Sequence, residues 1–153
     1  MLNPGDAAPN ISYATVDGGT AAIGDHKGRA LVLYFYPKDD TTGCTREAQD
    51  FTALAADFAK AGADIVGISK DSIKSHAKFA NKYGLKVTLG SDESGAACEA
   101  FGVWVEKSMY GRTYMGIERA TFLIDAGGRI ARVWRKVKVA NHATEVLETV
   151  KAL

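Results

Sequence analysis

Cys44 is the residue of this chain that could do chemistry most directly. A continuous apolar run ends at Tyr36, and a polar loop then leads to Cys44. Ala48, Phe51 and Ala55 lie four, seven and eleven residues further on, which is the spacing of one face of a helix. Cys44 therefore falls at the start of an amphipathic helix, where free N–H groups and the helix dipole favour an anion. A thiolate is an anion, so this position predicts a nucleophilic cysteine.

Two residues of the preceding loop could assist Cys44. Thr41, three residues earlier, carries a hydroxyl that can reach the sulfur or an oxygen bound to it. Pro37 begins the loop with a fixed φ and can pack over the site. Position alone leaves a second interpretation open, in which Cys44 is a half-buried structural residue, because free cysteines are often simply buried.

The remaining sulfur and the histidines do not form a recognisable ligand set. The chain has two cysteines, Cys44 and Cys98, too few for a disulfide-rich scaffold or a closed zinc site. It has no Cys-x-x-Cys pair, which argues against dithiol exchange. His26, His76 and His142 are scattered, and we expect His76 to lie on the surface of a helix. We therefore predict no structural metal.

The elements that would position Cys44 alternate between strands and helices. A central strand covered on both faces is expected for the apolar run 30–36. Alternation, buried runs and turn signals predict further strands at 11–16, 21–23, 65–69, about 87–89, 121–124 and 129–134.

Helical spacing and capping residues predict four helices. The first carries Cys44 and ends at Gly62, and a short one covers about 94–101. Between them, a helix capped by Asp71 or Ser72 and closed by Gly84 is expected to bury Ile73, Ala77, Ala80 and Tyr83. The last, capped by Asn141, would bury Ala143, Val146, Leu147, Val150 and Leu153.

This order of elements predicts an α/β fold with a mixed central sheet and helices on both faces. The layout resembles a thioredoxin-like domain with an extra N-terminal β-hairpin. No repeat or linker divides the chain, so we expect residues 1–153 to form a single domain. Fold class alone does not define a function.

Composition excludes several classes of protein. The chain has 153 residues, of which 46% are hydrophobic and 24% charged, and its net charge is +1, which argues against a general nucleic-acid binder. Its longest apolar run, 30–36, is far shorter than the roughly 20 residues that a membrane-spanning helix needs. The first residues lack the basic and apolar regions of a secretory signal. We expect a cytoplasmic protein that does not bind membranes.

The loop and helix start resemble a known active-site signature. Pro37-x-x-x-Thr41-x-x-Cys44 is similar to the signature of the peroxiredoxins, and residues 34–45 resemble the bacterioferritin-comigratory-protein branch, also called peroxiredoxin Q. Further similarity extends from Gly5 through 69–72 and 101–104 to the segment 119–125. The resemblance implies reduction of hydrogen peroxide and organic hydroperoxides without metal, haem or flavin.

The same resemblance assigns roles to four residues. It implies that Cys44 is the peroxidatic cysteine, which attacks the peroxide and becomes a sulfenic acid. Thr41 would bind the reacting oxygens, and Pro37 would shield the sulfur. Arg119 would stabilise the thiolate and the polarised O–O bond. Without the resemblance, Arg119 is more simply interpreted as a solvated charge at the end of a strand.

The sequence departs from the family pattern at the residues that recycle the enzyme. Relatives often have proline where Thr42 stands, so the loop here is expected to be less rigid. They carry a resolving cysteine at the position of Gln49 or of Ala80, and neither residue can form a disulfide. Cys98 is interpreted first as a small buried residue, with a fallback resolving role left open. We therefore expect one catalytic cysteine, recycled by an external thiol such as thioredoxin, glutaredoxin or glutathione.

A rival hypothesis is a catalytically silent thioredoxin-fold binding or holdase module. Retention of the whole set Pro37, Thr41, Cys44 and Arg119 argues against it, because a silent module needs none of them. We expect a monomer, since resolution across a dimer would need a partner cysteine that the sequence does not place.

Overall fold

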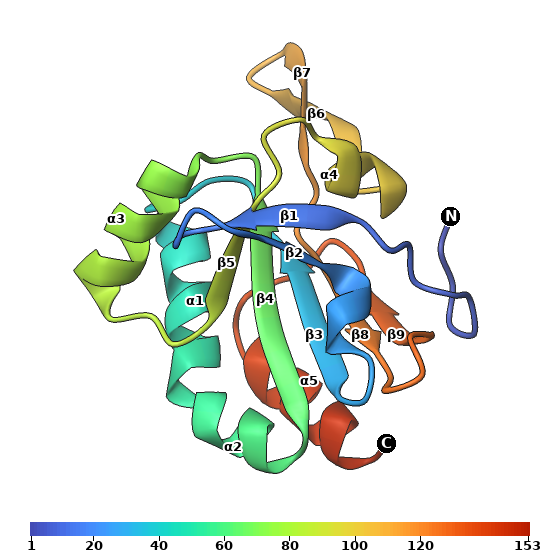
Figure 1. Ribbon diagram of the computed structural model, residues 1–153. Coiled ribbons are helices and arrows are strands. Elements are labelled where there is room, and N and C mark those ends of the chain that lie inside the picture. Colours follow the sequence, from blue (N-terminus) through green and yellow to red (C-terminus); the bar gives the residue numbers. More distant parts are fainter.

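The apolar run that begins at Ala30 forms the central strand of the molecule. The computed structural model describes residues 1–153, and in it β3 (Ala30–Phe35) is buried along its whole length. β3 pairs in parallel with β4 (Ala63–Ser69) and antiparallel with β8 (Ala120–Ile124). The order of the seven-stranded mixed sheet is β2-β1-β5-β4-β3-β8-β9 (Figure 1). The outer strands are β1 (Ser12–Thr15), β2 (Thr20–Ala22), β5 (Thr88–Ser91) and β9 (Ile130–Trp134).

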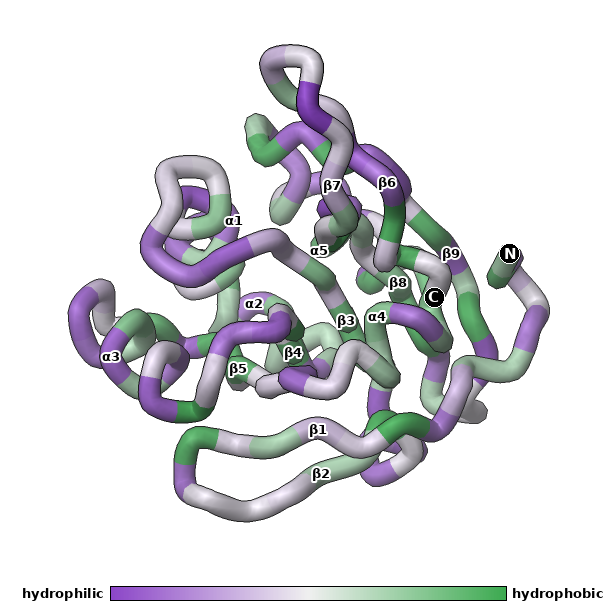
Figure 2. The backbone as a smooth tube through the Cα atoms, turned by 90° about the horizontal axis from the view of Figure 1, so that it is seen from above, coloured by the Kyte–Doolittle hydropathy of each residue, from purple (hydrophilic) through white to green (hydrophobic).

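Helices cover both faces of this sheet, as the sequence predicts. Alternate residues of β3 point to opposite sides, so Val32 and Tyr34 belong to one core and Leu33 and Phe35 to the other. The first core packs under α1 (Thr42–Ala53), α2 (Ala55–Lys60), α3 (Ile73–Tyr83) and α5 (His142–Lys151). The second packs under α4 (Ala96–Ala100) and the short 3-10 helix Ile23–His26. The chain is accordingly hydrophobic along β3 and β4 and more hydrophilic on parts of α3 and the periphery (Figure 2).

The predicted N-terminal hairpin is confirmed, and its place in the sheet is now defined. β1 and β2 pair antiparallel, and β1 also pairs antiparallel with β5. The hairpin therefore extends the sheet beyond β5. The predicted pair of strands near the C-terminus is also confirmed as β8 and β9, which are antiparallel.

The single long helix expected after Cys44 is two helices. α1 ends at Ala53 and α2 begins at Ala55, because the N–H of Leu54 bonds back to the carbonyl of Phe51 in a tighter turn. The change of direction lets Phe58 of α2 reach the same core as Phe51, with ring centroids 5.8 Å apart. Periodicity alone does not reveal such a break, because apolar spacing continues through it.

The expected buried face of α3 is wrong at two positions. Ser72 caps this helix by accepting from Ser75 N–H, and Gly84 ends it in the left-handed conformation, as predicted. Ala77 is exposed, however, whereas His76 is completely buried. The expectation that His76 lies on the surface is therefore incorrect, because polar partners in the neighbouring loop and strand satisfy its ring. At the end of α5, Leu153 is also exposed rather than packed.

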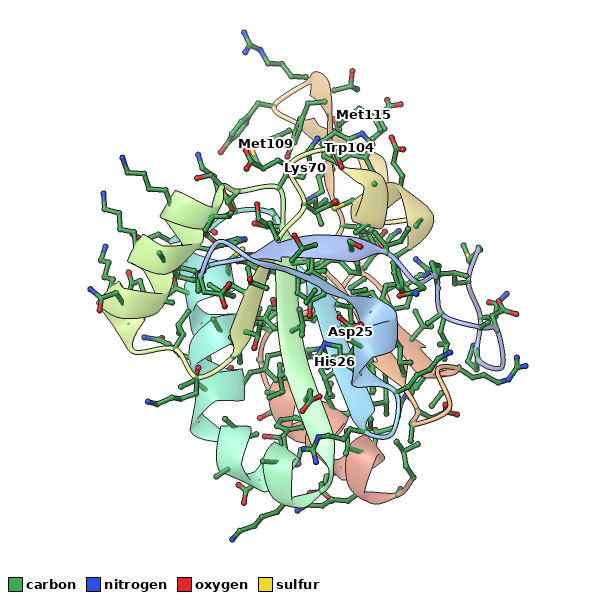
Figure 3. All side chains as sticks on the ribbon, viewed as in Figure 1. Asp25, His26, Lys70, Trp104, Met109 and Met115 are labelled. Carbon is green, nitrogen blue, oxygen red and sulfur yellow. The ribbon has the colours of Figure 1, made fainter.

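A second, two-stranded sheet has no counterpart in the sequence prediction. β6 (Trp104–Met109) and β7 (Arg112–Ile117) form an antiparallel hairpin that projects from the body (Figure 1). The Lys70 ammonium lies 4.2 Å from the centre of the Trp104 ring at the base of this hairpin, whereas Met109 and Met115 lie towards its tip (Figure 3). Most of its residues are partly or fully exposed, so alternation of buried and polar residues is weak and does not signal a strand.

None of the helices in this fold has the length and apolar character that crossing a membrane requires.

Candidate active site

The first turn of α1 holds Cys44. Thr41 is the N-cap residue in an extended conformation, and its carbonyl accepts the N–H of Thr45. The N–H groups of Gly43 and Cys44 therefore have no intramolecular acceptor and are free to donate to an anion. Only 2% of Cys44 is exposed, so its sulfur is screened from bulk water. This placement agrees with the expectation from the sequence.

Arg119 reaches the sulfur from the start of β8, the strand that pairs with β3. It precedes β8, and its Nη2 donates to Cys44 Sγ at 3.3 Å although the two residues are 75 positions apart. Gly43 leaves room for this approach, since a Cβ there would lie 3.2 Å from Nη2 and the guanidinium would have to shift slightly. A guanidinium in contact with sulfur stabilises the negative charge of a thiolate. The geometry therefore favours the site interpretation of Arg119 over a solvated charge.

Glu47, which the sequence analysis did not single out, completes this charge cluster. Arg119 Nη1 donates to Glu47 Oε1 at 2.7 Å, and only 1% of the Glu47 side chain is exposed. Burial raises the pKa of Glu47 to about 7, although the Arg119 charge opposes that rise. The other carboxylate oxygen is buried without a partner. Glu47 lies three residues after Cys44, so its position on the buried helical face was a usable signal.

The two loop residues singled out by the sequence, Pro37 and Thr41, both lie exposed in the segment before α1. The Thr41 hydroxyl donates to the carbonyl of Lys38 at 2.8 Å, which leaves its lone pairs free to accept. The partner of the Thr41 hydroxyl is therefore the loop backbone rather than the sulfur. Pro37 begins the loop directly after the buried Tyr36 and is exposed to solvent.

Lys107 of the projecting hairpin lies close enough to the site for the charges of Arg119 and Cys44 to affect its pKa. Burial and then the Arg119 charge lower the pKa of Lys107, whereas the Cys44 charge raises it. The hairpin thus brings a second cation towards the sulfur. The exposed strands of this hairpin give no clear pattern in the sequence, so Lys107 was not among the expected site residues.

Comparisons with known proteins agree with this arrangement. A model of the AhpC/TSA family matches residues 4–133. A "Peroxiredoxin Bcp" of Xanthomonas campestris is 50% identical over 154 residues, covering 96% of this chain and 96% of that protein. The chain belongs to the AhpC/TSA family of peroxiredoxins. A "Putative peroxiredoxin bcp" of Coxiella burnetii is 49% identical to this peroxiredoxin over 146 residues, which are 95% of this chain and 97% of the relative.

Solved structures show the same fold. A Xanthomonas campestris bacterioferritin comigratory protein, studied for alkyl peroxide reduction, matches this peroxiredoxin with a TM-score of 0.91 at 47% identity, covering 99% and 97% of the two chains. A cysteine-to-serine mutant of Xylella fastidiosa PrxQ matches with a TM-score of 0.94 at 41% identity, covering 99% and 97%. These similarities confirm the predicted thioredoxin-like fold and the family, and the protein is a thiol peroxidase.

The second cysteine of this peroxiredoxin lies in a different core from the first. Both are free, but Cys44 packs with α1 and α5 on one face of the sheet, whereas Cys98 packs with α4 on the other. Cys98 is fully buried, and burial followed by its hydrogen bond to Asp92 raises the pKa of its thiol. Gln49 is exposed on α1, and Ala80 is half-buried on α3. The geometry favours the interpretation of Cys98 as a buried apolar residue.

Proposed function

We propose that this peroxiredoxin reduces hydrogen peroxide and organic hydroperoxides through Cys44 alone. The observation that carries the proposal is the 3.3 Å contact between Arg119 Nη2 and Cys44 Sγ at the start of α1. The Cys44 thiolate attacks the terminal peroxide oxygen, the O–O bond breaks, and the leaving oxygen takes a proton to become water or an alcohol. Cys44 is left as a sulfenic acid.

Three neighbours have supporting roles in this proposal. Arg119 stabilises the thiolate and then the charge that moves onto the leaving oxygen. The Thr41 hydroxyl, held by the Lys38 carbonyl, accepts a hydrogen bond from the peroxide O–H. Pro37 limits access of water to the sulfur, with Cys44 already 98% removed from solvent by the surrounding fold.

An external thiol completes the cycle in this proposal. A first thiol attacks the sulfenic sulfur and releases water, and a second thiol attacks the mixed disulfide and regenerates the Cys44 thiol. Thioredoxin, glutaredoxin and glutathione are the classes of donor that fit. Free Cys44 and Cys98 support a reducing compartment such as the cytoplasm, and a monomer suffices because no second subunit is needed for resolution.

The decisive experiment is the intact mass of the reduced protein after one equivalent of peroxide, with and without a small thiol. The expected product without thiol is the protein plus one oxygen, trapped at Cys44 by a sulfenic-acid reagent. With glutathione, the expected product is a mixed disulfide. An intramolecular disulfide in the absence of thiol would contradict the one-cysteine mechanism, and unchanged mass would contradict the peroxidase role of Cys44.

A further inference from the structure

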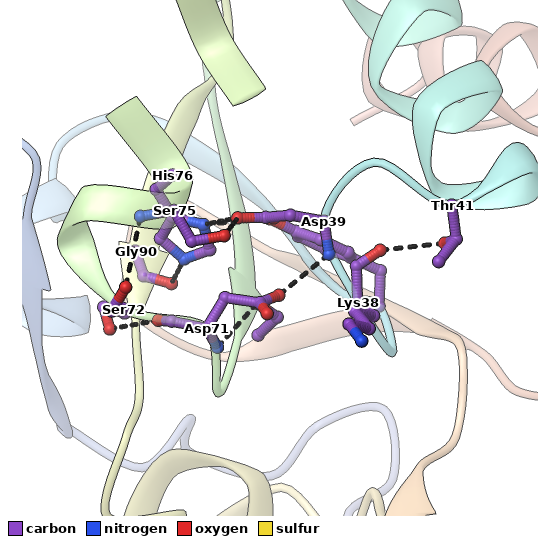
Figure 4. A network of polar contacts seen from close by, with 11 residues as sticks. Lys38, Asp39, Thr41, Asp71, Ser72, Ser75, His76 and Gly90 are labelled. Carbon is purple, nitrogen blue, oxygen red and sulfur yellow. Dashed lines mark hydrogen bonds and ion pairs between the residues drawn. The ribbon is translucent and has the colours of Figure 1, made fainter. Parts of the chain in front are cut away.

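A buried histidine–carboxylate pair lies behind the active-site loop, and the mechanism above makes no use of it. His76 of α3 is completely buried, and its Nδ1 lies 2.7 Å from Oδ2 of Asp39, a residue of the loop between Pro37 and Thr41. Its Nε2 lies 3.0 Å from the carbonyl oxygen of Gly90 in β5 (Figure 4). The pair therefore joins the loop to a helix and a strand that are distant in sequence.

The partners of the ring decide its hydrogen-bonding role. The Gly90 carbonyl can only accept, so Nε2 carries a proton and donates. Asp39 already accepts from the Tyr36 hydroxyl at 2.6 Å and from the Ser75 hydroxyl at 2.8 Å. Burial raises the pKa of Asp39, but the bonds from His76, Tyr36 and Ser75 outweigh it and hold that pKa below its usual value. Asp39 Oδ2 therefore accepts from Ser75 and is in hydrogen-bond contact with His76 Nδ1 as well.

The same network fixes the backbone of the loop. Asp39 N–H donates to Asp71 Oδ2 at 2.8 Å, and Asp71 also accepts from the Ser69 hydroxyl at 2.6 Å. Lys38, the residue before Asp39, holds the Thr41 hydroxyl through its carbonyl (Figure 4). Asp39 is thus tied to Asp71 and His76 and lies two residues before Thr41 in the same short loop.

A metal ion is the other chemistry that these groups could support. Ligand atoms of Asp39, Asp71 and His76 all lie within 4.8 Å of one another. Each of those atoms already has a hydrogen-bond partner within the protein, and both nitrogens of His76 are engaged, Nδ1 with Asp39 and Nε2 with the Gly90 carbonyl. A ring whose two nitrogens are both held in hydrogen bonds offers no free lone pair to a metal, so the hydrogen-bond network accounts for the cluster.

We propose that His76 and Asp39 are positioning residues for peroxide reduction, which hold the loop so that Thr41 meets the peroxide at Cys44. This rests on the proposed function and adds residues outside the signature segment. Displacement of a catalytic group by about 1 Å can slow a reaction about 100-fold. Loss of the Asp39–His76 bond should therefore slow the reaction with peroxide and leave the later reaction with thiol unchanged.

The experiment separates the two bonds of the ring. In His76→Asn the amide nitrogen can replace Nδ1 and still donate to Asp39, whereas in His76→Gln it replaces Nε2 and reaches only Gly90. We expect His76→Gln to lower the rate constant for sulfenic acid formation about 10- to 100-fold, measured by stopped-flow. We expect His76→Asn to recover most of that loss, and kcat/KM for the thiol donor to be the same in both variants.

The chain offers a matched control at the other end of the sheet. His26, like His76, is hydrogen-bonded to an aspartate: its Nδ1 lies 2.8 Å from Asp64 Oδ2. Its Nε2 lies 2.9 Å from the Tyr13 hydroxyl, and the residue lies away from α1 (Figure 3). His26→Gln should leave the peroxide rate unchanged. Ser75→Ala removes one hydrogen bond to Asp39 without unpairing a charge, so it tests the proposal if the His76 variants fold poorly. We expect it to lower the rate constant for sulfenic acid formation about two- to fivefold.

Formation of the Cys44 sulfenic acid by the wild-type protein tests the proposed function separately from the His76 variants. If His76→Gln, His76→Asn and Ser75→Ala then all match the wild-type peroxide rate, the positioning role is overturned. The same conclusion follows if His26→Gln slows the reaction as much as His76→Gln, because the effect would then reflect general stability.

Discussion

The buried Arg119 guanidinium near Cys44 is held by hydrogen bonds to two partners, the Cys44 sulfur and the Glu47 carboxyl. The Cys44 sulfur, the Arg119 guanidinium and the Glu47 carboxyl lie in one contact chain, largely removed from water. Isolated buried charges are costly, but charges paired with hydrogen bonds are tolerated and remain in fixed positions. The pairing therefore keeps Arg119 in place before the peroxide arrives, which is the condition for electrostatic catalysis.

Substitution of the sulfur tests the chemistry directly. Cys44→Ser should abolish peroxidase turnover, because a hydroxyl at the same place is not ionised and cannot accept the oxygen. The fold should survive, since the two side chains are of similar size. Peroxide consumption with a thiol donor and circular dichroism together measure both expectations. Turnover in a folded Cys44→Ser protein would remove the mechanism.

Arg119 is the next residue whose contribution can be measured. Arg119→Ala should slow sulfenic acid formation about 100-fold, the usual size of losing one donor to a developing charge. Alkylation of Cys44 at neutral pH should also become slower. Arg119→Lys should recover part of the rate, because a lysine restores charge but cannot contact Cys44 and Glu47 with one planar group. Equal rates in the wild type, Arg119→Ala and Arg119→Lys would show that Arg119 has only a structural role.

The raised pKa of Glu47 predicts that the free energy of unfolding depends on pH. Its pKa rises from 4.5 to about 7 on folding, so the folded state favours the protonated carboxyl. The stability that this group contributes is present below pH 4.5 and is lost as the pH rises to about 7. Glu47→Gln stays neutral, so the stability of wild type relative to this variant should fall by on the order of 2 kcal/mol over that range. Urea unfolding at several pH values measures the difference; parallel pH curves would contradict it.

Packing of β3 against β4 and α1 positions the helix that holds Cys44. Tyr34 lies opposite Gly67 in the strand register, and its ring stacks on Phe51 of α1 with centroids 4.8 Å apart. A Cβ on Gly67 would lie 2.5 Å from the Tyr34 ring, so glycine is required for that ring to lie flat on the sheet. The Tyr34–Phe51 contact therefore holds α1 in a fixed position on the sheet.

This packing predicts a specific loss of stability. Gly67→Ala should cost about 1–3 kcal/mol, because the added methyl forces Tyr34 out of its place in a well-packed core. Gly127→Ala is the matched control, since a Cβ there meets only the Asp125 carboxylate at 3.3 Å on an exposed turn. The control should change stability by less than about 0.5 kcal/mol. Denaturant unfolding compares them, and equal effects would refute the role of Tyr34.

At the scale of the whole molecule, the central sheet separates the two sulfurs. Cys44 belongs to the core under α1 and α5, and Cys98 to the core on the opposite face. A disulfide needs Cα atoms within about 7 Å. A bond between these residues would therefore require α1 or α4 to leave the sheet.

This separation predicts that Cys98 does not resolve the sulfenic acid. Cys98→Ser should retain turnover with a small-thiol donor, and non-reducing peptide maps of the oxidised wild type should lack a Cys44–Cys98 disulfide. Without a resolving sulfur, the sulfenic acid persists, so sulfinic acid should accumulate at high peroxide. A Cys44–Cys98 disulfide as the main product, with turnover lost in Cys98→Ser, would establish a two-cysteine enzyme instead.

Much of this peroxiredoxin could be predicted from the sequence, because the relevant signals are local. The apolar run at β3, the helical spacing after Cys44 and the caps of α3 each depend on residues within a few positions of one another. Backbone geometry converts such spacing into one strand or one helix face with little help from the rest of the chain. The placement of Cys44 at a helix start follows from the same local pattern.

Contacts between segments that are distant in the sequence were decided only by the tertiary structure. His76 is buried because Asp39 and Gly90, 37 and 14 residues away, satisfy both ring nitrogens; by sequence alone it is a polar residue on a helix. Glu47 finds Arg119 only when β8 packs beside β3. Spacing along the chain cannot predict these partners, because a buried polar group is tolerated only when the fold brings its partner to it.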